Sequence, residues 1–214
     1  QMSFAISLTE AQAIETRDDL ITEVKAELNR SDISDIEVRS AIQRLEARLN
    51  RILRVPAMET VATATLVSGV AALPTDFLVL RALYDAAKRK IAAVDPLAMI
   101  ETQTGGTKVH AIVGGSIRVA PPADEVVTAI YYAKIPPLNI SAPSNWLLKD
   151  HADIYFYGTL VALEARIGND ERIGLWKAAL DESVSELIDF GNRQRFGGPL
   201  TMRMAIPQVR GARI

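Results

Sequence analysis

The chain has 214 residues, of which 49% are apolar and 23% are charged, and its formal net charge is −2. This composition is typical of a globular protein with one domain or two small ones, and it excludes an intrinsically disordered chain. The near-neutral charge gives no general attraction to nucleic acid or acidic lipid. Without cysteine, disulfides and thiolate chemistry are excluded. The N-terminus lacks the pattern of a signal peptide and no apolar stretch is long enough to span a bilayer, so we expect a soluble protein.

Residues 1–56 are predicted to form an N-terminal helical hairpin. Thr9–Gln12 (TEAQ) and Ser34–Glu37 (SDIE) each match a capping box, in which a hydroxyl and a carboxylate or amide side chain satisfy N–H groups at a helix start. Apolar residues at helical spacing follow each box, and Pro56 ends the second helix. Because the link between the two helices is short, we expect them to be antiparallel.

Residues 57–140 are predicted to form an inserted β-sheet region. TVATATLV alternates threonine with apolar side chains, which is the period of a half-buried strand. TKVHAIV, SIRVA and VVTAIYYAK indicate three further short strands joined by short turns, which predicts an antiparallel meander. DPLAMIE indicates one short helix.

Residues 141–190 are predicted to form a C-terminal helical hairpin, with Gly168 between its helices and Gly191 as the stop after the second. Gly158 falls inside the first of these helices, where glycine costs about 1 kcal/mol relative to alanine. We therefore expect another element to approach the backbone closely there. The expected fold class is α+β: a four-helix bundle made of the two hairpins, with an inserted small antiparallel β-sheet and an extended C-terminal arm.

The C-terminal arm, residues 191–214, contains five arginines and no acidic residue. Chain ends are often frayed, but a solvated tail is normally poor in large apolar residues, and this segment has several. The mixture favours an arm that becomes ordered on a partner. Its candidate docking residues are Arg193, Arg195, Phe196, Leu200, Met202, Arg203, Met204, Ile206, Val209, Arg210 and Arg213.

The most suggestive chemical cluster is Asp150, His151 and Asp153. A zinc site needs three or four ligands, and a chain with two histidines and no cysteine would have to supply them largely from carboxylates. Aspartates in the first turn of a helix satisfy free N–H groups, so we interpret the cluster as a helix start. Gly105–Lys108 (GGTK) lacks the spacing of a phosphate-binding loop and precedes a strand, so it is interpreted as a turn. We therefore predict no catalytic residues, no metal and no cofactor.

Arg44, Arg48 and Arg51 are spaced so that they share one face of the second helix. The simplest interpretation is a solvated face interleaved with Glu37 and Glu46. A stripe that faces DNA is the alternative.

Several segments, in this order, resemble the head-to-tail adaptor (head-completion or connector) proteins of tailed bacteriophages: LPTDFLVLRALY, VHAIVGGSIRVAPPAD, VTAIYYAKIPPL, SNWLLKDHADIYFYGTLVALEA and RFGGPLTMR, within residues 73–203. The resemblance implies a structural virion protein of the head-tail neck, assembled in the host cytoplasm. Such adaptors form a ring, typically of twelve copies, beneath the portal protein. The ring extends the DNA exit channel, so genomic DNA is only passing cargo, and it provides a platform for tail proteins of the nozzle, tube or stopper kind.

The resemblance also implies that the C-terminal arm docks to the portal. The spacing of Arg44, Arg48 and Arg51 makes them the candidate channel-facing residues of such a ring. No membrane partner is implied. Two other functions stay open from the sequence alone. A tail-associated cell-wall hydrolase would need a carboxylic acid of raised pKa in a cleft. A non-specific DNA-channel binding module would need basic surface along the DNA path.

Overall fold

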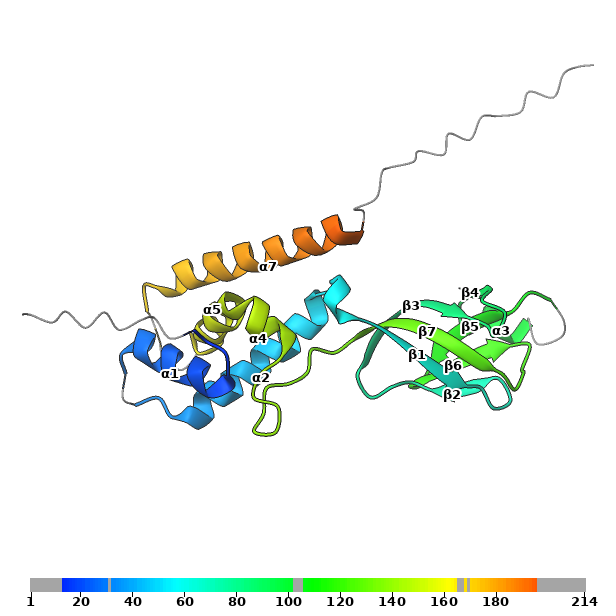
Figure 1. The fold of residues 1–214 in the computed structure, drawn as a ribbon, viewed down its shortest axis with the longest axis horizontal. Helices are drawn as coiled ribbons and strands as arrows, with labels where there is room; N and C mark the ends of the chain where they lie inside the picture. The colour runs from blue at the N-terminus through cyan, green and yellow to red at the C-terminus, as the bar shows by residue number, and fades with distance from the viewer. Residues whose placement is uncertain (1–12, 31, 102–105, 165–167, 169, 196–214) are drawn as a thin grey trace, which may run out of the picture.

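The computed structural model describes residues 13–30, 32–101, 106–164, 168 and 170–195. These residues form two parts that lie next to each other along the long axis of the molecule (Figure 1). The first, the helical body, contains α1 (Arg17–Leu28), α2 (Asp35–Ile52), α4 (Trp146–Asp150), α5 (Ala152–Ala162) and α7 (Ile173–Arg195). The second, the barrel, contains β1 (Glu59–Thr65), β2 (Val70–Ala72), β3 (Phe77–Tyr84), β4 (Lys90–Ala93), β5 (Val109–Val113), β6 (Ser116–Ala120), β7 (Val126–Ala133) and the short α3 (Ala98–Glu101).

The predicted fold class is wrong. The described residues form a mixed α/β structure with a seven-stranded, nearly closed barrel-like sheet and five helices in the helical body, and not a four-helix bundle with a small sheet. One reason is local: a further short helix, α4, precedes the predicted helix start and ends at His151, where the backbone leaves helical geometry before α5. The other reason is that seven strands bury a core of their own, distinct from the core of the helical body. None of the described helices is long and apolar enough to cross a membrane.

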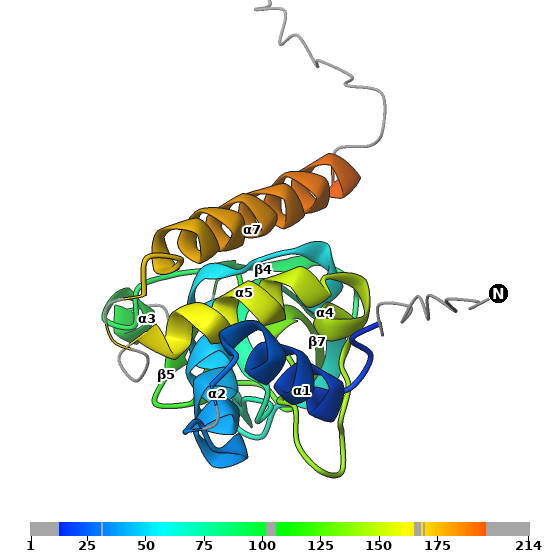
Figure 2. The ribbon, with the colours of Figure 1, turned by 90° about the vertical axis from the view of Figure 1, so that its left-hand side faces the viewer.

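The helical body is organised around α5, which contacts α1, α2 and α7. Figure 2 shows α7 lying across α5, with α1 and α2 below it. Apolar residues at helical spacing make these contacts, and Leu20, Val24, Leu45, Ile154 and Leu160 are almost completely buried. The predicted close approach at Gly158 is confirmed, because a Cβ atom at this position would lie 2.5 Å from Cδ1 of Leu45.

The helix ends follow local chemistry. Ser34 and Glu37 form the predicted capping box at the start of α2. Thr9–Gln12 lies outside the described residues, and the first helix begins only at Arg17, with a capping box made by Thr16 and Asp19. The predicted stop at Gly191 is wrong, since α7 continues to Arg195.

The strands follow the order β1-β7-β3-β4-β5-β6-β2. All described pairs are antiparallel except β4 with β5. The predicted meander is therefore wrong: β5 and β6 form a hairpin, but β7 pairs with β1 and β3 and not with β6. The link between β6 and β7 instead hydrogen-bonds to the turn that joins β1 and β2, where Leu66 donates to Glu125 and Gly69 donates to Ala123.

Candidate functional site

The last turn of α7 is anchored where the helical body meets the barrel. Arg195 donates hydrogen bonds to the main-chain oxygen of Arg54 at 2.6 Å and to the Tyr132 hydroxyl at 2.5 Å. Its guanidinium also forms an ion pair with Glu59 at 3.1 Å and lies over the Tyr132 ring. Glu59 pairs in turn with Arg81 of β3. The described chain therefore ends at a point fixed to both parts of the molecule.

The predicted docking residues of the arm are divided by this point. Arg193 is exposed on the last turn of α7, and Arg195 is half-buried in the contacts just described. The others lie outside the described residues: Phe196, Leu200, Met202, Arg203, Met204, Ile206, Val209, Arg210 and Arg213.

The three arginines of α2 are all exposed and share one face of the helix. Arg44 also donates a hydrogen bond to the main-chain oxygen of Ala162 at 3.0 Å, so one arginine of the stripe also helps to close the end of α5. The sequence-based prediction that Glu46 interleaves with this stripe on the exposed face is wrong, because the Glu46 side chain is buried.

Glu46 is instead the centre of a buried polar network that sequence analysis missed. It accepts hydrogen bonds from the Leu138 N–H at 2.8 Å and the Tyr155 hydroxyl at 3.0 Å. Asn145 donates to the same hydroxyl at 2.7 Å, and Asn50 accepts from the Ile135 N–H at 2.8 Å. These contacts fasten the chain that returns from the barrel onto α2 and α5.

Burial raises the pKa of the Glu46 carboxyl above its usual value, and the two hydrogen bonds it accepts oppose this effect. Burial likewise raises the pKa of the Tyr155 phenol, with a further contribution from the Glu46 charge. A signal for this network was present in the sequence: Glu46 lies four residues after Ile42 and three before Leu49, inside the apolar stripe of α2.

The two histidines occupy unrelated positions. His151 lies at the junction of α4 and α5, and the side chain that caps the start of α4 is that of Asn145. Asp150 is in the last turn of α4 and only Asp153 is in the first turn of α5, so the predicted pair of capping aspartates is wrong. His110 is buried in the barrel, where its Nδ1 donates to the Ile91 oxygen at 3.1 Å and burial lowers its pKa. Within the described ranges, no group of three or more His, Asp or Glu side chains could hold a metal ion.

Comparison with known proteins places the chain in a family. A family model described as SU10 adaptor protein matches residues 16–203, which is most of the chain. None of the curated proteins compared with the chain matches it. The match begins at the Thr16 cap of α1 and includes all of the helical body and the barrel. The chain therefore belongs to the SU10 adaptor protein family, a family of phage head-to-tail adaptors.

Proposed function

We propose that this protein forms a ring of twelve copies beneath the portal of a phage head, where it extends the DNA exit channel and offers a docking platform for tail proteins. Membership of a head-to-tail adaptor family supports this function, because such a protein has to bind one partner on the head side and another on the tail side. The family is structural, and the protein is proposed to act by assembly and not by catalysis.

The observation that carries the proposal is the anchoring of Arg195 at the junction of the two parts. The residues that follow it, 196–214, therefore start from a fixed position on the body. They contain Arg203, Arg210 and Arg213 and no acidic residue. Large apolar side chains supply affinity, and arginines select an acidic, correctly oriented acceptor, so we assign portal docking to this arm.

The exposed face of Arg44, Arg48 and Arg51 is proposed to line the channel. DNA that passes through a ring needs weak, sequence-independent contacts, and arginines on a rigid helix provide them through the phosphates. Tail proteins are proposed to bind elsewhere on the ring, which leaves the arm free for the portal.

Two triple variants separate these assignments, because each removes three positive charges. Arg203→Gln, Arg210→Gln and Arg213→Gln together should abolish co-migration with purified portal. Arg44→Gln, Arg48→Gln and Arg51→Gln should leave portal binding unchanged. Negatively stained images of wild-type protein mixed with portal should show closed rings with a fixed number of copies. Random or sub-stoichiometric loading would count against the adaptor function.

A further inference from the structure

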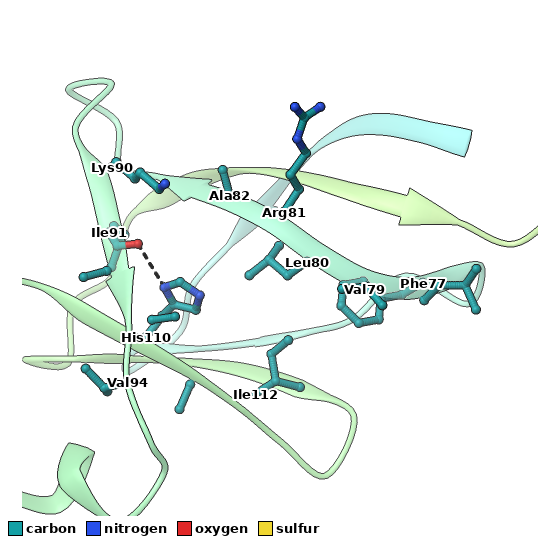
Figure 3. Close-up of a pocket in the computed structure, with 14 residues that line it drawn as sticks. Phe77, Val79, Leu80, Arg81, Ala82, Lys90, Ile91, Val94, His110 and Ile112 are labelled. Atoms are coloured by element: carbon teal, nitrogen blue, oxygen red, sulfur yellow. Dashed lines mark hydrogen bonds between the residues drawn. The ribbon is translucent and has the colours of Figure 1, made fainter. Parts of the chain in front are cut away.

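The barrel is open between β3 and β5. A cavity of about 770 Å³ occupies the opening, and its lining comes from the first six residues of β3, from β4 with the residue that follows it, and from His110, Ala111 and Ile112 of β5. Figure 3 shows Leu80 and Ile112 pointing into this space from opposite sides, and Arg81 pointing away from it. We call this opening the strand groove.

The strand groove exists because β4, which lies between β3 and β5, pairs with only a short length of each of them. Within the described ranges, β4 pairs with β3 at Leu83 and Tyr84, and with β5 at Val109 and His110. The rest of β3 pairs with β7 on one side and faces the groove on the other. An unpaired strand edge presents free N–H and C=O groups, so the groove is suited to accept an added strand.

The side chains around the groove define what would fit. Leu80 and Ile112 give the groove its apolar surface, and Ile112 is 40% exposed although it belongs to a strand of the barrel. The charged residues that line the groove, as far as the structure describes it, are the basic Lys90 and Arg81, of which Arg81 points away from it and pairs with Glu59. The complementary ligand is an extended segment with one apolar face and acidic rather than basic residues.

Residues 1–16 of the same sequence have these properties. Met2, Phe4, Ile6 and Leu8 alternate with Ser3, Ala5, Ser7 and Thr9, which is the period of a strand with one apolar face. Glu10 and Glu15 are the charged residues of the segment, and the first basic residue is Arg17. The C-terminal arm also contains an alternating stretch, but its arginines would meet Lys90 with the same sign of charge. The charges therefore select the N-terminal segment.

From these observations we infer that residues 2–9 of one copy bind in the strand groove of a second copy, as an added strand beside β3. Figure 1 places α1 and β4 at opposite ends of the molecule, so the donor is a neighbouring copy. Residues 10–12 then join the strand to the described chain, in which Ile14 packs on the helical body, so residues 9 and 13 lie at most about 14 Å apart. Neighbouring copies must therefore meet with the helical body of one near the barrel of the next, a head-to-tail contact that can close into a ring. The inference specifies the copy-to-copy contact of the proposed ring, but it does not depend on binding to the portal.

Single cysteines test the inference directly, since the chain has none of its own. Chains with Ser3→Cys, Ala5→Cys or Ser7→Cys are each co-expressed with a differently tagged chain that carries Val79→Cys. Residues opposite each other on paired strands have Cβ atoms about 5 Å apart, so one of the three positions should form a heterodimeric disulfide in high yield. Val61→Cys is the control acceptor, because Val61 is exposed at 65% on the edge strand β1, outside the groove.

A second pair of variants distinguishes the two faces of the segment. In the chain that carries Ala5→Cys, Phe4→Asp with Ile6→Asp should abolish the cross-link to the Val79→Cys chain, whereas Ser3→Asp with Ser7→Asp should retain it, because only the first pair places charge against the apolar groove. Tryptophan fluorescence of each variant, compared with that of wild type, separates loss of the cross-link from loss of folding.

Three results would overturn the inference: equal cross-linking to Val79 and Val61, a disulfide within one chain when both cysteines are in the same molecule, or a cross-link that survives Phe4→Asp with Ile6→Asp. The measurement is made on free protein and on protein bound to portal. A ring that binds the portal without the Val79 cross-link would refute the strand exchange and leave the proposed function intact. The cross-link without portal binding would refute the portal assignment and leave the strand exchange intact.

Discussion

In the helical body a single apolar cluster extends from α1 to α7, whereas in the barrel the apolar residues form two clusters and are exposed at the strand groove. The helices bury most of their apolar faces against one another within one chain, although Leu175 and Phe190 of α7 are exposed. The barrel strands leave a length of β3 without a partner on one side. The difference lies in the main chain: helices pair their own N–H and C=O groups, whereas β3 keeps an edge to which a strand can be added.

The two parts can be followed separately in solution. Trp146 and Trp176 are the two tryptophans of the chain, and both belong to the helical body. Tryptophan fluorescence therefore reports on the body, and amide hydrogen exchange of β7 reports on the barrel.

The largest effect is expected from Gly158→Leu. Because a Cβ atom alone would lie 2.5 Å from Leu45, the larger side chain overpacks the contact between α2 and α5, at a cost of about 3 kcal/mol. Urea denaturation followed by tryptophan fluorescence measures the loss. Gly174→Leu in α7 is the matched control, because its Cβ would meet nothing within 4 Å. Equal stability of the two variants would mean that the close contact at Gly158 does not exist.

Arg195→Met is expected to loosen the connection between the two parts. It removes the hydrogen bonds to Arg54 and Tyr132 and the ion pair with Glu59, and should lower stability by about 1–2 kcal/mol. The exposed Arg193→Met, on the same turn of α7, should change stability by no more than about 0.5 kcal/mol. In the Arg195 variant only, fluorescence and hydrogen exchange should show the helical body and the barrel unfolding separately, at different free energies. If the two parts of the Arg195 variant still unfold together, another contact couples them.

Glu46→Gln should alter the pH dependence of the body. The folded state raises the pKa of this carboxyl, so it binds the proton more tightly than the unfolded state does. Stability should therefore fall as the pH rises from the unfolded pKa, about 4.3, through the raised folded value, with a slope of at most about 1.4 kcal/mol per pH unit. Glutamine keeps an oxygen acceptor for Leu138 and Tyr155 but has no proton to release, so denaturation at a series of pH values should show a shallower slope. A slope identical to that of wild type would assign the pH dependence to another group.

The smallest effect is expected from His151→Ala, at no more than about 0.5 kcal/mol. His151 lies between α4 and α5 and is only partly buried. Elemental analysis of purified wild-type protein should find no bound zinc. Stoichiometric zinc that is lost in the variant would restore the metal-site interpretation of the Asp150–Asp153 segment.

Local features of the sequence predicted local structure well. The capping box at Ser34 and Glu37, the alternating strands and the crowded Gly158 were all within reach, because each depends on a few neighbouring residues. Gly191 was wrongly predicted to end a helix, because glycine occurs both at helix ends and at sites where a neighbouring segment packs close to the helix. Here it lets Pro56 approach α7, where a Cβ atom would lie 2.8 Å from Cδ of Pro56. The sequence does not distinguish a glycine that ends a helix from one that admits a neighbour.

The order of the strands was not predictable from the sequence in the same way. β7 follows β6 in the chain but pairs with β1 and β3, and these pairings depend on which distant edges meet when the barrel closes. The burial of Glu46 needed only the periodicity of α2, yet a charged residue is normally assigned to solvent unless its partners are known. Those partners, Leu138 and Tyr155, come from segments far along the chain.

The position of the barrel within the chain also determines the order in which the molecule can fold during synthesis. All seven strands lie within residues 59–133, so the whole barrel has been synthesised before α4 is made. The helical body needs α1 and α2 from the beginning of the chain and α4, α5 and α7 from its end. On the ribosome, α1 and α2 must therefore keep their apolar faces without their final partners until the last part of the chain emerges, whereas the barrel has all its strands early.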